Sequence, residues 1–427
     1  MKSTTTFALR TADELTAHSH GTSLLDALDI ARDIVRDVRT EGLQALRRYV
    51  TSLDGRAESD PLFLDRAETQ RAWDGLTEDD RLRLDRIATR IRTFGEAQMR
   101  TLHEADVAVP GGRAGHTVAP VERAGCYAPG GLYPLPSTVL MTTLTARVAG
   151  VPEVWLATPA ASPFMLAAAH VADVDGVLVA GGAQAIASLA YGVDPLKPCD
   201  VVVGPGNKYV TAAKHVVAGD VRIDMPAGPS ELVIIADGSA TPAIIAADLL
   251  AQAEHDHDAL PILITTEERL VASVRAELER QLETLPTAPV ARVALRNGGA
   301  CLVGSLEEAI ALSDTLAAEH VQVCTENAAD VGRRLGHYGA LFIGERSPEV
   351  LGDYGVGPNH VLPTARGARS VGGLSVFTFL RVRTWLACAG QPDRTLYDDV
   401  RWLARIEGLE GHARAVELRE TKAVRSG

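Results

Sequence analysis

The sequence predicts an α/β protein built on two parallel β-sheets with helices on both faces. From about residue 120 onwards, short β-rich runs alternate with Ala-rich segments of helical spacing, which is the pattern of βα units. Apolar residues make up 46% of the chain but aromatic residues only 4%, so the core must consist of Ala, Val, Leu and Ile, as expected where helices pack on a parallel sheet. The length of 427 residues allows roughly two to four domains.

Residues 23–105 are predicted to be mainly helical. Apolar residues recur at helical spacing from Leu24 to Ile34 with charged residues between them. Thr77 and Asp80 form a capping-box pattern ahead of an amphipathic helix expected at 81–99. The pair Gly111-Gly112 marks a turn.

The alternating region divides into two stretches, 120–230 and 231–345, each expected to form one sheet. Strands are expected at 152–158, 176–179, 200–203, 231–236, 261–265, 321–324 and 340–343. Helices are expected at 163–171, 183–191, 210–217, 242–254 and 306–318, and the tail at 385–427 is also expected to be helical.

Charge and cysteine content exclude several classes of protein. The formal charge of −13 opposes general binding to nucleic acid or to an anionic membrane. The five cysteines lie far apart without a CxxC pair, which disfavours a disulfide framework and a cysteine-rich zinc site. The segment 1–6 lacks an apolar signal, and no apolar run approaches membrane-spanning length, so we expect a cytoplasmic protein without a membrane partner.

Glu319 and His320 are the most informative pair of side chains. They lie between a predicted amphipathic helix and the apolar run 321–324, and a carboxylate beside an imidazole can move a proton near neutral pH. Glu near a helix C-terminus opposes the helix dipole, so helix stability does not explain its position. The alternative is that His320 is only a C-terminal cap.

Three segments carry side chains that can bind a transition metal. Gln252 and His255 are three residues apart and would share one face of a helix, although a solvated helix end is the simpler alternative. Asp353 and His360 lie in the segment 352–364, whose glycines and prolines predict a structured loop rather than a helix or ordinary strand. Glu407 and His412 flank two glycines that should break a helix, which could bring both side chains into one loop or be an ordinary helix junction.

Three Gly-rich turns could present backbone N–H groups to an anion such as a pyrophosphate. One is the turn Gly204-Pro205-Gly206-Asn207 after a predicted strand, but Tyr209 occupies the place of the third glycine in a dinucleotide-binding fingerprint. The second is the turn 180–184, which contains Gln184. In the third, 125–131, Tyr127 could stack on a planar ring or simply pack in the core.

Taken together, these segments resemble the histidinol dehydrogenase family. The matching strings run in the family's order over most of the chain, at 122–131, 136–141, 179–187, 203–207, 223–231, 252–255, 319–320, 352–364 and 412–416.

The resemblance implies a zinc- and NAD-dependent enzyme that oxidises L-histidinol to L-histidine through the aldehyde, using two NAD+ and one water. It implies Glu319 and His320 as the acid/base pair. The implied zinc ligands, one ion per subunit, are Gln252, His255, Asp353 and His412. The implied substrate contacts are the same four residues with Ser230, His320 and Glu407. The implied NAD contacts are Tyr127, Gln184 and Asn207.

The resemblance also implies the domain organisation. It implies two Rossmann-like, doubly wound sheet domains with small N- and C-terminal helical segments in an intertwined homodimer. The expected parts are an arm at 1–22, a first α/β domain at 23–122 with 231–372, an NAD-side domain at 123–230, and a C-terminal tail at 373–427. The tail would deliver Glu407 and His412 to the neighbouring subunit's site.

Three other functions stay open at this stage. Where the family usually has Asp-x-Phe-x-Lys, residues 377–381 read Phe-Thr-Phe-Leu-Arg, so a relative acting on another polar alcohol, such as a sulfonated diol, is an alternative substrate reading. A zinc hydrolase, in which Glu319 activates water, would need no nicotinamide. A non-catalytic binding protein would have no reason to retain both Glu319 and His320.

Overall fold

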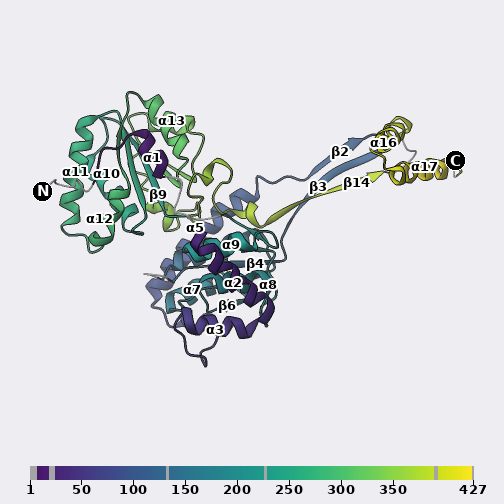
Figure 1. Ribbon diagram of the computed structural model, residues 1–427, viewed down its shortest axis with the longest axis horizontal. Coiled ribbons are helices and arrows are strands. Elements are labelled where there is room, and N and C mark those ends of the chain that lie inside the picture. The colour runs from purple at the N-terminus through teal and green to yellow at the C-terminus, as the bar shows by residue number, and fades with distance from the viewer. Residues whose placement is uncertain (1–6, 19–24, 131–133, 226–227, 389–392, 426–427) are drawn as a thin grey trace. The chain divides into compact units, whose positions relative to one another are not determined.

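The computed structural model describes residues 7–18, 25–130, 134–225, 228–388 and 393–425 (Figure 1). Gly131, Pro226 and Ala227 of the strings quoted above, and parts of the expected arm at 1–22, lie outside these residues. The chain forms two compact units, Met1–Gln98 with Val121–Phe379, and Met99–Pro120 with Leu380–Gly427.

The larger unit contains a six-stranded sheet in the order β1-β6-β5-β4-β7-β8. All neighbouring strands are parallel except β1, which pairs antiparallel with β6 at one edge. The strands are β1 (Phe63–Leu64), β4 (Arg123–Tyr127), β5 (Glu153–Ala157), β6 (Gly176–Leu178), β7 (Val201–Val203) and β8 (Arg222–Ile223). Because the chain places β5 and β6 on one side of β4 and then β7 on the other, the strand order reverses between β4 and β7.

Helices cover both faces of this sheet. One face packs in a single apolar core with α2 (Leu25–Glu41), α3 (Leu43–Leu53), α8 (Gly182–Tyr191) and α9 (Lys208–Val217). Helices α6 (Pro136–Val148) and α7 (Pro163–Val171) pack against each other, and α6 contacts β4 and β5. α4 (Arg66–Asp74) contacts α7, and α5 (Glu78–Met99) starts after Thr77, whose hydroxyl accepts the N–H of Asp80 at 3.2 Å.

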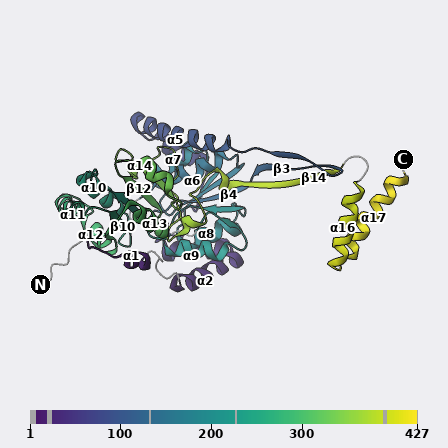
Figure 2. The ribbon, with the colours of Figure 1, turned by 90° about the horizontal axis from the view of Figure 1, so that it is seen from above.

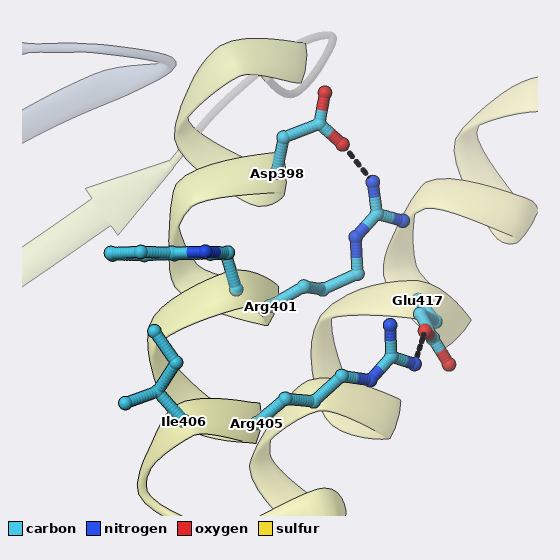
Figure 3. Close-up of a pocket in the computed structure, with 6 residues that line it drawn as sticks. Asp398, Arg401, Arg405, Ile406 and Glu417 are labelled. Carbon is cyan, nitrogen blue, oxygen red and sulfur yellow. Dashed lines mark hydrogen bonds and ion pairs between the residues drawn. The ribbon is translucent and has the colours of Figure 1, made fainter.

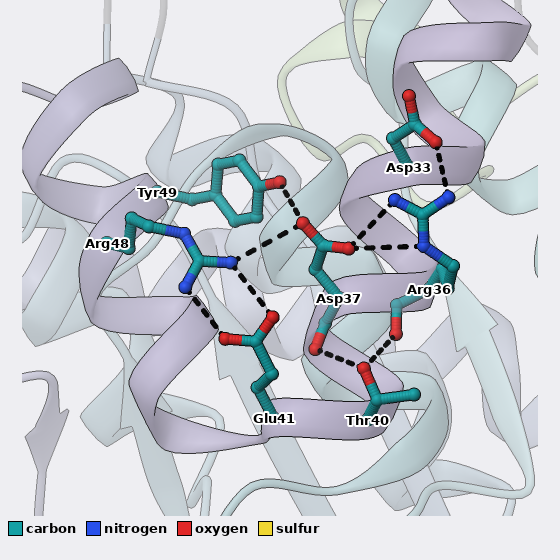
Figure 4. Close-up of polar contacts among 7 residues, drawn as sticks. All are labelled: Asp33, Arg36, Asp37, Thr40, Glu41, Arg48 and Tyr49. Atoms are coloured by element: carbon teal, nitrogen blue, oxygen red, sulfur yellow. Dashed lines mark hydrogen bonds and ion pairs between the residues drawn. The ribbon is translucent and has the colours of Figure 1, made fainter.

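A surface network joins α2 to α3 (Figure 4). The Tyr49 hydroxyl donates to Asp37 at 2.6 Å, and Arg48 pairs with Glu41 at 2.8 Å. The bond from Tyr49 is the main reason that the pKa of Asp37 is lowered. Residues 23–122 were predicted to belong with the other sheet. The domain limits stay a prediction, and the apolar core that α2 and α3 share with α8, α9 and the six-stranded sheet favours assigning them to that sheet.

The second sheet of the larger unit has five parallel strands in the order β11-β10-β9-β12-β13. They are β9 (Glu231–Ala236), β10 (Leu260–Thr265), β11 (Gly299–Leu302), β12 (His320–Cys324) and β13 (Ala340–Ile343). Alternate residues of β9 face opposite sides of the sheet. Leu232 and Ile234 pack on the side of α10 (Pro242–Ala253), α11 (Glu268–Leu282) and α12 (Ala288–Asn297). Val233 and Ile235 pack on the side of α13 (Leu306–Leu316) and α14 (Ala328–Arg334). Helix α1 (Ala12–His18) contacts α13. The prediction of two parallel sheets in an α/β fold is confirmed.

The smaller unit is a three-stranded antiparallel ribbon carrying two helices at one end (Figures 1 and 2). Its strands β2 (Ala105–Val109), β3 (Gly112–Pro120) and β14 (Leu380–Cys388) pair in the order β14-β3-β2, with the predicted turn at Gly111. The helices α16 (Arg394–Ile406) and α17 (Glu410–Arg425) pack on each other. The prediction of a helical tail from residue 385 was wrong at 385–388, which belong to β14.

Two general expectations can be compared with the described residues. All five cysteines are free thiols, in agreement with the absence of a disulfide framework. Within the described ranges, no helix has the length and apolar character needed to cross a membrane.

Candidate active site

The candidate acid/base residues lie at the amino edge of the five-stranded sheet. Glu231 and His320 begin the neighbouring strands β9 and β12, and His320 pairs with Leu232. Helix α10 follows the carboxyl end of β9 and returns alongside the sheet, so Gln252 in its last turn and His255 just beyond it come back to this amino edge. Open α/β sheets usually bind their ligands at the carboxyl edge. This site lies at the opposite edge and is built from the starts of strands and from the segments that lead back to them.

His320 is buried, with only 5% of its surface exposed. Its Nδ1 lies 3.2 Å from the backbone carbonyl of Glu231. A carbonyl can only accept, so Nδ1 carries the proton and Nε2 keeps a free lone pair. Burial lowers the pKa of His320 to about 4, against the opposing charge of Asp353, so the ring is neutral near pH 7.

Glu319 and Glu231 hold each other in place at the start of the two strands. The Glu231 N–H donates to Glu319 Oε2 at 3.0 Å, and the Glu319 N–H donates to Glu231 Oε2 at 3.3 Å. Burial raises the pKa of Glu231 to about 7 and that of Glu319 well above its usual range, where the charges of Glu231 and Asp353 also act. A hydrogen bond involving the side chain of Ser230, which directly precedes β9, partly opposes the shift at Glu319.

Glu319 lies in the short connection between α13 and β12 rather than on a helix. The helix was predicted to reach residue 318, but it ends at Leu316 because Ala317 adopts a left-handed conformation with φ of 47°. Two residues then bring Glu319 to the sheet edge, with its Oε2 3.6 Å from His320 Nδ1.

Asp353 lies between two imidazoles. Its Oδ2 is 3.6 Å from His255 Nε2, and its Oδ1 is 3.9 Å from His320 Nε2. Burial raises the pKa of Asp353, but the close approach of His255 and the charges of the nearby histidines outweigh it, so its pKa lies below the usual value. The same approach of the Asp353 carboxylate raises the pKa of His255. Glu319, His320, Asp353 and His255 therefore form one continuous chain of proton-binding groups.

These residues include a donor set suited to a divalent cation. Gln252 is fully buried, and neither of its amide atoms has a hydrogen-bond partner among the described residues. His255 lies just past the end of α10 and not within it, because Glu254 is the C-cap; its side chain is 43% exposed. One nitrogen or oxygen each from His255, Asp353 and Glu349 lie within 4.8 Å of one another. Nitrogen and oxygen donors of this kind fit Zn2+.

The segment after Asp353 ties this site to the six-stranded sheet. His360 Nδ1 lies 2.9 Å from the carbonyl of Asp353, and its Nε2 lies 3.0 Å from the hydroxyl of Thr138 in the first turn of α6. Asn359 donates to the Met141 carbonyl at 2.8 Å. The segment 352–364 was predicted to contain no helix, which is wrong for its first two residues, because a single helical turn, α15 (Val350–Asp353), ends at Asp353.

The residues expected to contact NAD lie at the carboxyl edge of the six-stranded sheet. Tyr127 ends β4, and its hydroxyl accepts the Gly182 N–H at 3.2 Å. Tyr127 is 3% exposed and packs in the core. Gln184, also buried, donates to Asp54 at 3.0 Å, and Asp54 also accepts the Gly181 N–H at 2.9 Å. Gln184 Oε1 has no partner among the described residues.

The turn after β7 is held by a buried ion pair. Asn207 caps α9 by accepting the N–H groups of Tyr209 and Val210 at 3.0 and 3.2 Å. Lys214 pairs with Asp224, donates to the Gly204 carbonyl at 3.0 Å, and Asp224 accepts the Gly204 N–H at 2.7 Å. Gly204 has φ of 119°, and a Cβ there would lie 2.0 Å from the Tyr127 carbonyl oxygen, so glycine is required. This turn thus lies at the crevice where the strand order reverses, the usual place for a nucleotide.

Comparison with known proteins decides the family. The model of the histidinol dehydrogenase family matches residues 18–420. The chain belongs to the histidinol dehydrogenase family. A histidinol dehydrogenase from Thermus thermophilus is 46% identical over 92% of this chain and 94% of its own. One from Haloarcula marismortui is 41% identical over 95% and 97% of the two chains. The crystal structure of histidinol dehydrogenase from Elizabethkingia anophelis has 31% identity and a TM-score of 0.90, with 98% of each chain covered. This is a family of NAD-dependent oxidoreductases.

Two residues expected from the histidinol dehydrogenase resemblance lie in the smaller unit. Glu407 is the C-cap of α16, and His412 lies in the first turn of α17, so the predicted helix break at Gly408 is present but His412 is not in a loop. Both are exposed.

An open pocket lies on the two helices of the smaller unit (Figure 3). Its lining consists of Asp398, Arg401, Trp402, Arg405, Ile406 and Glu417. Arg405 donates to Glu417 at 2.6 Å, and Arg401 pairs with Asp398 and Glu420. The arginines therefore have carboxylate partners already, while Trp402 and Ile406 are 65% and 63% exposed.

The segment 377–381, which departs from the histidinol dehydrogenase pattern at Phe377 and Arg381, makes local contacts. Thr378 lies in a 3-10 turn, η2 (Val376–Phe379), and its hydroxyl accepts the Ser375 N–H at 3.4 Å. Arg381, in β14, donates to the Pro120 carbonyl at 2.8 Å. Another 3-10 turn, η1 (Gly367–Arg369), follows the loop after α15.

Sequence reasoning missed Asp54 and Glu349 and gave Glu231 no role. Glu231 ends one matching string, which was a usable signal. Asp54 and Glu349 lie outside every matching string, and only the folded chain brings them to Gln184 and Asp353.

Proposed function

We propose that this chain oxidises L-histidinol to L-histidine through L-histidinaldehyde, using two NAD+ and one water, at the amino edge of its five-stranded sheet. The observation that carries the proposal is the chain of buried Glu319, His320 and Asp353, extended by the partly exposed His255, in a member of the histidinol dehydrogenase family. The names of the relatives favour this substrate over another polar alcohol.

His320 is proposed as the base of the first oxidation. The alcohol loses its hydroxyl proton to Nε2 and a hydride from its carbinol carbon, which gives the aldehyde. His320 suits this step because it is buried and neutral, and because the Glu231 carbonyl holds the proton on Nδ1. Asp353, 3.9 Å from Nε2, stabilises the imidazolium that forms.

Glu319 is proposed as the base of the second oxidation. Water must add to the aldehyde before a second hydride can leave, and the attacking water must lose a proton. A carboxylate whose pKa is raised by burial takes that proton more readily than an ordinary glutamate. The reciprocal bonds with Glu231 fix its orientation.

When bound, NAD+ supplies the hydride acceptor and a zinc ion supplies an anchor for the nitrogen atoms of the substrate. We propose Gln252, His255 and Asp353 as zinc ligands from one subunit. We propose contacts of Tyr127, Gln184 and Asn207 with NAD. The tie from Asp353 through His360 to Thr138 supports this arrangement, because it connects the amino-edge site to α6 of the sheet that carries these residues.

His412 and Glu407 are proposed to complete the site of a second copy in a homodimer, with His412 on the zinc and Glu407 on the substrate. Their exposed positions on a helical hairpin with an exposed apolar side support this. Ser230 is proposed as a further substrate contact. We also propose a cytoplasmic location and no nucleic-acid partner, in keeping with the formal charge of −13.

The test separates the two oxidations. Replacing His320 with Ala should suppress alcohol oxidation, by about 100- to 10,000-fold for loss of a general base. Replacing Glu319 with Gln should reduce aldehyde oxidation more than alcohol oxidation. NADH formation is followed with L-histidinol and with L-histidinaldehyde as separate substrates. Equal losses in both half-reactions for Glu319→Gln would refute its role.

Sharing between subunits is tested with two inactive variants. His255→Asn and His412→Asn are mixed, dissociated and re-associated, so that mixed dimers contain one site with neither substitution. Regained activity supports sharing, and its complete absence in mixed dimers of confirmed composition contradicts it. Product formed without NAD+ would instead favour a zinc hydrolase.

A further inference from the structure

Glu349 is a buried carboxylate without a partner. It is 0% exposed, and neither of its oxygens accepts a hydrogen bond from any described residue. Leaving a charged carboxylate in this state costs several kcal/mol, so such a group needs a cation or a proton nearby. Glu349 takes no part in the proton transfers proposed for Glu319 and His320.

The backbone fixes Glu349 beside Asp353. The Glu349 carbonyl accepts the N–H groups of Gly352 at 2.7 Å and Asp353 at 3.4 Å, which closes the single turn of α15. Residues four apart on a helical turn share one face, so the two carboxylates point the same way. One ligand atom each from His255, Glu349 and Asp353 lie within 4.8 Å of one another.

Two carboxyl groups held this close, in a buried place, can both be ionised only beside a positive charge. Asp353 already has His255 as a partner, at 3.6 Å, but Glu349 has none. Two carboxylates, a neutral imidazole and the neutral amide of Gln252 would together balance the charge of one divalent cation. Without Glu349, the ion together with its remaining ligands would keep a net charge of +1.

We propose that Glu349 is a second carboxylate of the cation site and sets the affinity of this chain for zinc. This rests on the proposed zinc site and adds a residue to it. Glu349 acts on the ion, by contact or through a ligand, and not on the substrate's protons.

The experiment measures zinc binding to the full-length chain by competition with a chromophoric chelator. Glu349→Gln, which keeps the size of the side chain and removes its charge, should weaken binding by about 10- to 100-fold, as for other residues that support a metal site. Zinc should also raise the unfolding temperature of this variant less than that of the unaltered chain. The matched control is Asp248→Asn, because Asp248 is also buried but accepts from Gln322 at 2.7 Å and lies outside the cation cluster. Its zinc affinity should be unchanged.

Zinc affinity of Glu349→Gln within about threefold of the unaltered chain would overturn the inference, since a residue that supports a metal site changes affinity tenfold or more. If that variant does not fold, Glu349→Asp decides: it keeps the charge but withdraws it, so weaker binding is expected and equal binding overturns the inference. His255→Asn and Asp353→Asn separate this outcome from failure of the zinc site. If both retain zinc, the proposed site itself is wrong; if both lose zinc while Glu349→Gln retains it, only the role of Glu349 is wrong.

Discussion

Replacing Lys214 with Met should destabilise the six-stranded sheet and loosen the turn after β7. Lys214 is 1% exposed and pairs with Asp224, whose side chain is fully buried. Removing Lys214 leaves the Asp224 carboxylate buried without a counter-charge and removes the donor to the Gly204 carbonyl.

The expected loss of stability follows from the burial of the Lys214–Asp224 ion pair. Breaking one partner out of a buried ion pair typically lowers the free energy of unfolding by about 3–5 kcal/mol, far more than loss of a surface pair. The charge is the main cause, so Asp224→Asn in the same chain should restore part of the stability: the amide oxygen can still accept the Gly204 N–H, and no buried charge remains. The coupling between the two substitutions should be about 2–3 kcal/mol.

Urea denaturation of both single variants and the double variant measures these differences. Lys208→Met is the control, because Lys208 is on the same helix but exposed, and it should change stability by no more than about 0.5 kcal/mol. Lys214→Met should also bind NADH more weakly, since the Gly204 turn loses an anchor. A loss below about 1 kcal/mol for Lys214→Met, or fully additive effects in the double variant, would refute the reasoning.

Three further predictions concern other parts of the chain. Burial raises the pKa of Asp248 from 3.8 to about 6, so the stability linked to its protonated form is present below pH 3.8 and is lost as pH rises through 6. Asp248→Asn should therefore raise the free energy of unfolding by about 1–3 kcal/mol at pH 8 but not at pH 3.5. Denaturant titrations at the two pH values measure this, and an equal increase in the free energy of unfolding at both would contradict the prediction. Asp54→Ala should weaken NADH binding by about 10- to 100-fold in a fluorescence titration. The reason is that the Gly181 N–H and the Gln184 amide both lose the carboxylate that accepts from them. Glu58→Ala, which changes an exposed residue, is the control and should leave NADH binding unchanged. Trp402→Asp should shift the chain towards monomer in sedimentation experiments, and an unchanged dimer would exclude this face from the interface.

The βα units could be predicted because their signals are local. The helix expected at 163–171 is α7, and the strand expected at 231–236 is β9, with the same limits. Buried strands and Ala-rich helices between turn residues leave a clear period in the sequence, and tertiary contacts did not override it.

The errors occur where distant pairing or a single backbone angle decides the structure. Strand β14 pairs with β3, at least 260 residues away along the chain, and most of its residues are exposed, so it has no buried apolar face to mark it as a strand. The left-handed conformation of Ala317 ended α13 early and placed Glu319 at the sheet edge. In the same way, Glu349 shows no motif, since its importance comes only from its burial beside Asp353.

The most direct test of the central claim counts NADH. Purified chain is supplied with zinc, NAD+ and a limiting amount of L-histidinol, and NADH and L-histidine are measured at completion. Oxidation through the aldehyde at the site of Glu319 and His320 predicts two NADH for each histidine formed. No NADH, or one NADH with the aldehyde as the final product, would contradict it.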